Sequence, residues 1–289
     1  MMNMTEIATV AARGALETRR RAGVVTSAPI CVYDLAEQLN IDVRFCGGNS
    51  FGGMYSKKSQ TILVPSLRPM GRQSFTCGHE LAHWFFEHGD RIDDSGAIED
   101  FHTNDVEERM ANVFSGHLLM PKRAVLEAFR CRGWDPLTCT AVQFYTVACQ
   151  LNVGYETLVQ HMQWSLRLLP EDTARLLLKW TPKAVRKKML GDIETRHLVI
   201  ADENWSTVAI DLQVGDLAIV PGGAAVENCR VATGESFGSG ALVRAEKPGI
   251  ARAAIPDGRW ASFIRVSRAD YEGRSKYRHL EDPDVYGTD

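Results

Sequence analysis

The segment 75–89 reads FTCGHELAHWFFEHG and contains the pattern HExxH at His79, Glu80 and His83. Apolar residues recur around this pattern at helical spacing, so the sequence predicts a helix over 72–88. One helical turn separates the two histidines, and their imidazoles can therefore bind one metal ion from the same face of the helix. Glu80 lies beside them and can accept a proton from water that the metal activates. The pattern is typical of zinc hydrolases, although two histidines can also lie together on an ordinary amphipathic helix.

A catalytic zinc ion normally has three protein ligands and a water, so a third ligand is needed. His88 lies five residues beyond His83, and a continuous helix would rotate it well away from the pair. A second helix is predicted over 104–120, and one of its stripes carries Glu108, Asn112 and small residues. That stripe can pack against the first helix, with Glu108 as the third ligand and Asn112 as a group that orients the site. A solvated helix face explains the same stripe equally well.

Two stretches in combination resemble the ImmA/IrrE family of zinc metallopeptidases: YSKKSQTILVPSLRPMGRQSFTCGHELAHWFFEHG at 55–89 and VEERMANVFSGHLLMP at 106–121. The family pattern is a GxY strand, an HExxH helix and an ExxxN helix that ends in LLMP, and the resemblance covers about residues 5–165. It implies that zinc is held by His79, His83 and Glu108, with Glu80 as the catalytic carboxylate. The chain departs from the pattern at Cys77 and Gly78 and in its C-terminal part.

Two further residues near the motif have alternative roles. Tyr55 lies on a predicted strand that borders the cleft, where its hydroxyl can polarise the scissile carbonyl as a catalytic group. A tyrosine in such a place more often packs in the core. Cys77 precedes His79 by two residues and points about 200° away from it on a helix. It is interpreted as a small buried side chain, with a redox switch at the zinc as the alternative.

Two segments raise the question of nucleic-acid binding. The predicted helices across 140–164 have helix-turn-helix spacing, but their flanks lack Lys and Arg, so packing is the better interpretation. The run KWTPKAVRKK at 179–188 contains five basic residues and is interpreted as a solvated helix face or linker, with an acidic partner or nucleic acid as the alternative. The net charge of −3 also argues against a surface built for phosphate. Direct nucleic-acid binding is therefore not expected.

The composition indicates a cytoplasmic protein. The seven cysteines are scattered and include no CxxC pair, which argues for reduced thiols and against a disulfide framework or a cysteine-rich zinc site. No stretch approaches 18 apolar residues, and the first residues lack the pattern of a signal peptide. We expect neither a membrane span nor secretion.

The periodicity of the sequence changes along the chain. Helical spacing dominates to about residue 190, whereas β-branched and alternating segments separated by Gly, Asp and Pro follow from about residue 197. The sequence therefore predicts an α+β fold: a zincin-like metallopeptidase domain at 1–168, with a small sheet and the HExxH helix, then a helical linker at 169–194. A smaller β-rich domain of unknown role is predicted at 195–289.

The residues and the resemblance together predict a zinc-dependent metalloendopeptidase with Zn²⁺ as its cofactor. The resemblance implies that its substrate is a specific intracellular protein, a helix-turn-helix transcriptional repressor, cleaved to control stress-response or mobile-element genes. The substrate would add a strand at the edge of the small sheet near Tyr55. The alternative is a regulatory binding module that keeps the fold without cleaving, but binding alone needs no Glu80.

Overall fold

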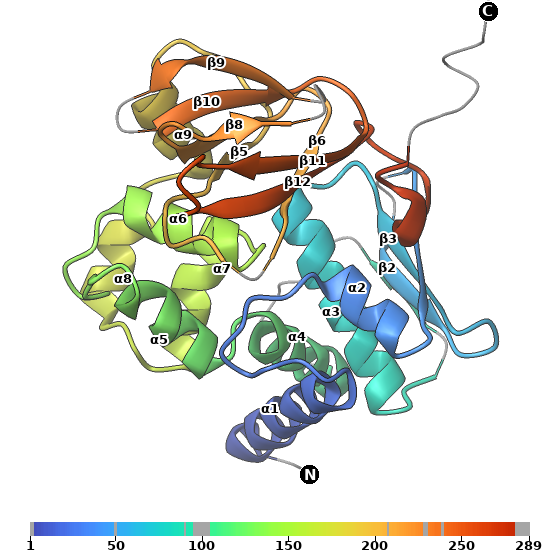
Figure 1. Ribbon diagram of the computed structural model, residues 1–289. Coiled ribbons are helices and arrows are strands. Elements are labelled where there is room, and N and C mark those ends of the chain that lie inside the picture. The colour runs from blue at the N-terminus through green and yellow to red at the C-terminus, as the bar shows by residue number, and fades with distance from the viewer. Residues whose placement is uncertain are drawn as a thin grey trace, which may run out of the picture.

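The computed structural model describes residues 3–48, 51–89, 91–94, 105–206, 208–227, 231–237 and 240–280. Helices dominate up to residue 190 and strands after it, as the colours of Figure 1 show from blue to red. The fold is therefore of the predicted α+β class, with a β-rich region after the helical part. Within the described residues, no helix combines the length and the apolar character that a membrane span requires.

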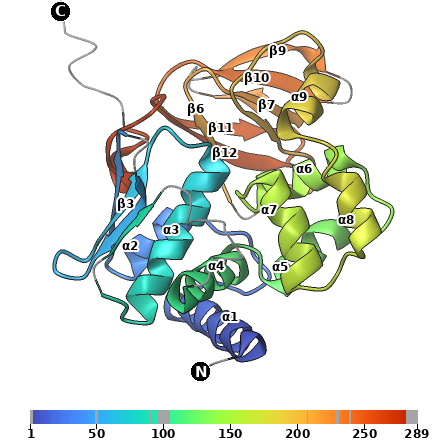
Figure 2. The ribbon, with the colours of Figure 1, turned by 180° about the vertical axis from the view of Figure 1, so that it is seen from behind.

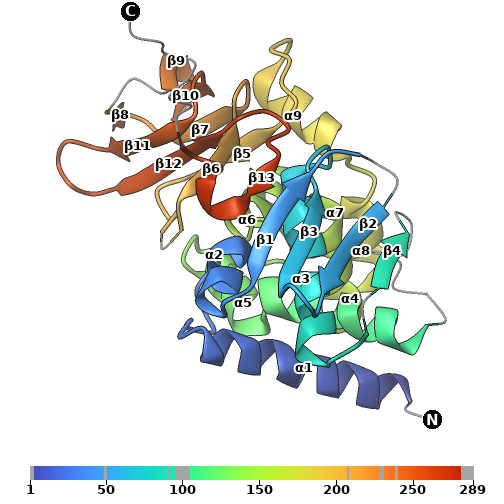
Figure 3. The same ribbon diagram turned by 90° about the vertical axis from the view of Figure 1, so that its right-hand side faces the viewer.

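The N-terminal part contains one sheet and a stack of helices on it: α1 (Met4–Arg21), α2 (Val32–Gln38), β1 (Asp42–Cys46), β2 (Phe51–Ser56), β3 (Thr61–Pro65), α3 (Met70–Phe85), β4 (Arg91–Asp94) and α4 (Val106–Leu119), with β13 (Gly273–Arg274) from the C-terminal end. The strand order is β13-β1-β3-β2-β4, with β1 parallel to β3 and the other pairs antiparallel. Helix α3 packs on β2 and β3, α4 packs on α3, and α1 packs on α4. Figure 3 shows the strands side by side in front of α3. The HExxH motif on α3 therefore lies between the sheet and α4.

The bounds of these helices follow local signals that the sequence carries. Helix α4 begins after Asp105, whose carboxylate accepts hydrogen bonds from the backbone N–H groups of Glu107 and Glu108. Asn104, the first residue of the predicted range, lies outside the described residues. Helix α3 ends at Phe85, three residues before the predicted end. That difference changes the position of His88, as described below.

Small residues bring α3 and α4 close together. The Ser115 hydroxyl on α4 donates a hydrogen bond to the carbonyl oxygen of Phe75 on α3 at 2.8 Å. A Cβ atom added at Gly78 would lie 2.6 Å from Ser115 Oγ, closer than real side chains approach. This contact gives a physical reason for the glycine at a position where the chain departs from the family pattern. It also confirms that the stripe with Ser115 faces the motif helix rather than solvent.

Further helices complete the helical part: α5 (Lys122–Arg130), α6 (Ala141–Gln150), α7 (Tyr155–Gln160), a π-helical turn at His161–Ser165, α8 (Glu171–Leu177) and α9 (Pro182–Leu190). The helical stretch predicted up to residue 190 is two helices, because Thr181 starts a new one. Its hydroxyl accepts a hydrogen bond from the Ala184 N–H, and Pro182 occupies the first helical position.

The pair with helix-turn-helix spacing packs inside the protein. Asn152 has a φ of 53° in the turn between α6 and α7, and the apolar faces of both helices are buried, as Phe144, Val147 and Leu158 show with 0% exposure. Helix α6 also contacts α9 and the first strand of the β-rich region. These contacts support the packing interpretation of the pair.

The described residues of the β-rich region form two four-stranded sheets. Their strands are β5 (Leu198–Ile200), β6 (Ile210–Gln213), β7 (Leu217–Pro221), β8 (Ala225–Val226), β9 (Val231–Phe237), β10 (Gly240–Ala245), β11 (Gly249–Ala254) and β12 (Ala261–Ser267). The orders are β5-β7-β10-β9 and β6-β12-β11-β8. The sheets enclose a core of their own, with Trp205, Ile210, Val220 and Ile264 buried in it. In Figures 1 and 2, α6 and α9 lie next to these strands.

The C-terminal end of the described chain returns to the N-terminal part. Strand β13 pairs with β1, with Arg274 opposite Arg44. In addition, Leu198, Leu217 and Ile219 of the β-rich region belong to the main apolar core. The two parts therefore share both a sheet and a core, and the predicted domain limits at 168 and 195 stay predictions.

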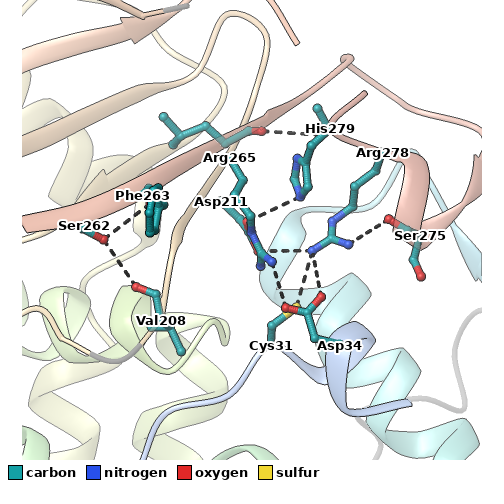
Figure 4. Close-up of polar contacts among 12 residues, drawn as sticks. Cys31, Asp34, Val208, Asp211, Ser262, Phe263, Arg265, Ser275, Arg278 and His279 are labelled. Atoms are coloured by element: carbon teal, nitrogen blue, oxygen red, sulfur yellow. Dashed lines mark hydrogen bonds and ion pairs between the residues drawn. The ribbon is translucent and has the colours of Figure 1, made fainter. Parts of the chain in front are cut away.

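An ionic cluster, buried except at Asp34, also ties the β-rich region to α2 (Figure 4). Arg265 on β12 lies opposite Asp211 on β6 in the parallel ladder, and its guanidinium donates to both carboxylate oxygens at 2.6 and 2.7 Å. A third hydrogen bond of 2.8 Å reaches Asp34 on α2. Arg278 lies 3.6 Å from both carboxylates. Burial raises the pKa of Asp211, but the two guanidinium groups outweigh it and hold this pKa below its usual value.

Replacing Arg265 with Ala is expected to lower the free energy of unfolding by about 3 kcal/mol, because it leaves Asp211 and its charge poorly compensated in a buried place. The side chains of Arg265 and Asp211 are only 17% and 10% exposed. Urea unfolding of the purified protein measures the change. The control is Arg252→Ala on the neighbouring strand, whose ion pair with Glu227 is about half exposed and which should cost less than about 1 kcal/mol. If both variants lost the same free energy of unfolding, the cluster around Arg265 would stabilise the fold no more than an exposed ion pair does.

Candidate metal centre

Three buried side chains from α3 and α4 bring their donor atoms together. His79, His83 and Glu108 are 0%, 1% and 6% exposed. The Nε2 atom of His79 lies 3.1 Å from Nε2 of His83 and 3.2 Å from Oε2 of Glu108. His83 Nε2 lies 3.6 Å from Oε1 of Glu108. This group can hold a metal ion, and it consists of the three residues that the sequence singles out as ligands.

The spacing of these donor atoms fits a tetrahedral ion. Ligand atoms at the usual zinc distances of about 2.0–2.1 Å lie about 3.3 Å from one another around such an ion. The separations of 3.1, 3.2 and 3.6 Å are close to that value. Two imidazole nitrogens and one carboxylate are also a known donor set of catalytic zinc sites, which keep a fourth position for water. Both the type and the spacing of the donors are therefore compatible with zinc.

Asn112 orients the first histidine. Its Oδ1 atom lies 2.9 Å from Nδ1 of His79, and Asn112 itself is fully buried one turn beyond Glu108 on α4. A proton on Nδ1 then donates to the amide oxygen, which leaves the lone pair of Nε2 directed at the other donors. The structure thus places Asn112 where the sequence predicts an orienting group.

His88 lies beside the second histidine, and the prediction that it rotates away was wrong. Its Nδ1 atom is 2.9 Å from Nδ1 of His83. Helix α3 ends three residues earlier, and Glu87 has a left-handed φ of 55°, which turns the chain back towards the motif. Because Gly89 follows directly and glycine is common at helix ends, the sequence contains a signal against a continuous helix. His88 therefore contacts Nδ1 of His83, as Asn112 contacts Nδ1 of His79.

Glu80 lies against the sheet, next to a strand glycine. Its side chain is 1% exposed, and a Cβ atom added at Gly53 on β2 would lie 2.3 Å from its Oε1 atom. No side chain larger than that of glycine fits there while the carboxylate keeps its place. Gly53 is the glycine of the GxY stretch, so this part of the pattern makes room for the predicted catalytic carboxylate.

Tyr55 is buried on β2, with 3% exposure, and its hydroxyl accepts a hydrogen bond from Nε2 of Gln60 at 2.9 Å. This contact gives the side chain a structural role, and a catalytic role for it stays a prediction. In the sheet, Tyr55 lies opposite Arg91 of β4. The strand that carries Tyr55 is therefore covered, and the edge of the sheet is formed by β4 instead of lying at Tyr55 as expected.

Cys77 packs in the core, as the sequence suggests. It is 0% exposed, and burial raises the pKa of its thiol well above the usual value. A thiolate is the form that binds metals and reacts with oxidants. The buried neutral thiol therefore supports the packing interpretation and not the redox switch.

A comparison with known families gives an independent result. Residues 36–162 match the model of the peptidase M78 family, described as an IrrE N-terminal-like domain. The matched range includes the five residues of the centre, His79, Glu80, His83, Glu108 and Asn112, while α1 and the β-rich region lie outside it. No curated protein matches the chain. Residues 36–162 of this chain are therefore an IrrE N-terminal-like domain, and they belong to the ImmA/IrrE family of metallopeptidase-like proteins.

Proposed function

We propose that the chain is a zinc-dependent endopeptidase that cleaves a specific intracellular protein. The observation that carries the proposal is the convergence of three buried donors, His79, His83 and Glu108. The chain also buries the carboxylate of Glu80, the residue that follows His79. A module that only binds could use the three donors for stability, whereas it has no use for this additional buried carboxylate. The peptidase family of residues 36–162 supports the same conclusion.

Each side chain of the centre is proposed to have a different role in peptide hydrolysis. Zinc in such a site supplies a Lewis acid that lowers the pKa of water and polarises a carbonyl group. Glu80 would accept the proton of the attacking water and pass it to the leaving amine. Asn112 and His88 would hold the two imidazoles in the orientation that directs Nε2 inward. Tyr55 is a candidate for the group that polarises the scissile carbonyl.

The substrate is proposed to be a helix-turn-helix transcriptional repressor, cleaved to control stress-response or mobile-element genes. The family of the N-terminal part supports this choice, since it implies such regulators as substrates. An extended segment of the substrate would pair with the sheet edge at β4, which follows the motif helix directly in the chain. Such pairing makes cleavage selective, because only an exposed strand-forming segment can add to an edge.

The experiment that tests the proposal uses the pure protein, loaded with zinc, and the transcription regulator encoded nearest to its gene. We expect one or a few discrete cleavage products, which disappear when a chelator removes the metal and return when zinc is added back. Casein should not be degraded. Binding of the regulator without cleavage would contradict the proposal and favour the non-cleaving regulatory module.

A further inference from the structure

A cavity of about 390 Å³ lies where the helical part meets the β-rich region, and we call it the junction cavity. Its walls come from the first turn of α3, from α6 and the turn after it, from α9, and from the chain between Arg196 and Asp211. The residues that the argument uses are Met70, Tyr145, Arg186, His197, Trp205 and Ala209. No residue of the metal centre lines this cavity.

The size and place of the junction cavity are those of a site for a small organic molecule. Protein interiors are packed densely and leave few voids larger than a water molecule. Sites for small ligands have about 300–1,000 Å³ and often lie between domains. The junction cavity falls in this range and separates two parts of the chain with partly separate cores.

Aromatic rings give the junction cavity apolar walls. The hydroxyl of Tyr145 donates to the carbonyl oxygen of Leu198 at 2.8 Å, and the indole N–H of Trp205 donates to that of Val208 at 2.9 Å. Since the polar atoms of both side chains are used within the protein, their rings offer apolar surface to an occupant. The walls therefore suit an aliphatic or aromatic body.

One positive charge at the junction cavity forms no ion pair among the described residues. It belongs to Arg186, which is half-buried on α9 next to Tyr145. Its guanidinium acts through space on the carboxyl of Asp216 without lying within ion-pair distance of it. Of the other charged residues in the lining, Arg196 pairs with Asp270 at 2.7 Å and Asp211 is held by Arg265, while Arg72 and Glu156 also lie in the wall. The guanidinium of Arg186, which forms no ion pair among the described residues, can therefore bind an acidic group from outside the protein.

The half-buried side chain of His197 adds a second polar group. Nδ1 of His197 is buried and has no hydrogen-bond partner among the described residues. Burial, followed by the charges of Arg186 and Arg196, lowers the pKa of His197 to about 4, so the ring is neutral at pH 7. A buried polar atom without a partner is costly, and a hydrogen bond from an occupant would satisfy it.

We propose that the junction cavity binds a small organic anion, with its apolar body against Tyr145 and Trp205 and its acidic group bound by Arg186. His197 Nδ1 provides a further hydrogen-bonding position. The wall with Arg186, His197 and Trp205 lies beyond residue 162, outside the family match, so the site belongs to this chain and not to the peptidase domain alone. Met70, in the first turn of α3, connects the site to the helix that carries the HExxH motif. The binding itself does not depend on the proposed function.

The test uses two fluorescent probes with the full chain. The first is 8-anilinonaphthalene-1-sulfonate, an apolar aromatic anion, and the second is its uncharged relative N-phenyl-1-naphthylamine. We expect saturable binding of the anion at one site per chain. Arg186→Gln should weaken binding of the anion about tenfold, the value of one charge-assisted contact, and should hardly change binding of the neutral probe.

Two further variants locate the binding. Lys187→Gln, one residue along α9, removes a charge from a neighbouring basic groove that Lys187 lines, and it should leave the affinity unchanged because Lys187 does not line the junction cavity. Ala209→Phe should fill the cavity and abolish binding of both probes. Urea unfolding checks that each variant folds. If Ala209→Phe fails to fold, the comparison of Arg186→Gln with Lys187→Gln still shows whether the anion binds in the junction cavity. Equal losses in that pair, unchanged binding in Arg186→Gln, or no saturable binding by the unchanged protein would overturn the proposal.

Discussion

Glu80→Gln should lower the rate of substrate cleavage by about 10²–10⁴-fold while the protein keeps its fold and its metal. The amide has nearly the shape of the carboxylate and fits beside Gly53, where the space is tight. It cannot accept a proton from water, however, so only the acid–base step is lost. The measurement is the cleavage rate of the regulator, together with the metal content and the thermal unfolding of the variant.

The matched control is Glu87→Gln, the same chemical change seven residues along the chain. The side chain of Glu87 is 79% exposed and lies 3.6 Å from Lys57, so its loss should leave cleavage within about twofold, as for other exposed charges. If Glu80→Gln cleaved as fast as the unchanged protein, the proposed mechanism would be wrong even with the metal in place. If it lost the metal, Glu80 would act as a ligand or as a structural group.

The convergence of His79, His83 and Glu108 can be predicted from the sequence because the signals are local. Two histidines one helical turn apart share a face in any helix, and the stripe with Glu108 and Asn112 follows from the period of a second helix. The sequence alone does not decide whether this stripe packs against another helix or faces solvent, and only the structure answers that. The contact of Ser115 with the Phe75 carbonyl shows that the stripe is packed.

The features that the sequence does not predict depend on contacts between distant segments or on a single backbone angle. His88 returns to the motif because Glu87 adopts a left-handed φ, a conformation that non-glycine residues seldom adopt. Strand β13 has only two residues, and nothing in them indicates that β1, more than 200 residues earlier, is its partner. The same holds for Asp34 and Arg265, which meet across the junction. Hydrophobic periodicity predicts individual helices and strands, but it does not predict which of them pack or pair with one another.

His79→Ala and His83→Ala should each abolish stoichiometric zinc binding, whereas the unchanged protein should contain one zinc per chain. Each variant leaves only two protein donors, one fewer than catalytic zinc sites use, and a water in place of the lost imidazole is a much weaker ligand. Elemental analysis of protein purified without chelators, followed by titration with a zinc indicator, measures the effect. The control is His117→Ala on α4, because His117 contacts His161 and lies outside the metal group.

The two remaining side chains of the centre should give smaller, graded losses that separate a ligand from an orienting group. Glu108→Ala removes a donor and the only negative charge of the three, and it should therefore weaken zinc binding more than Asn112→Ala does. Asn112→Ala frees the ring of His79 but keeps all three donors, for which a loss of about 10–100-fold in affinity is expected. Full zinc affinity in Glu108→Ala would show that the third ligand is another residue. Equal losses in the two variants would instead mean that Glu108, like Asn112, acts through the histidines, although its oxygens lie within 3.2 and 3.6 Å of their Nε2 atoms.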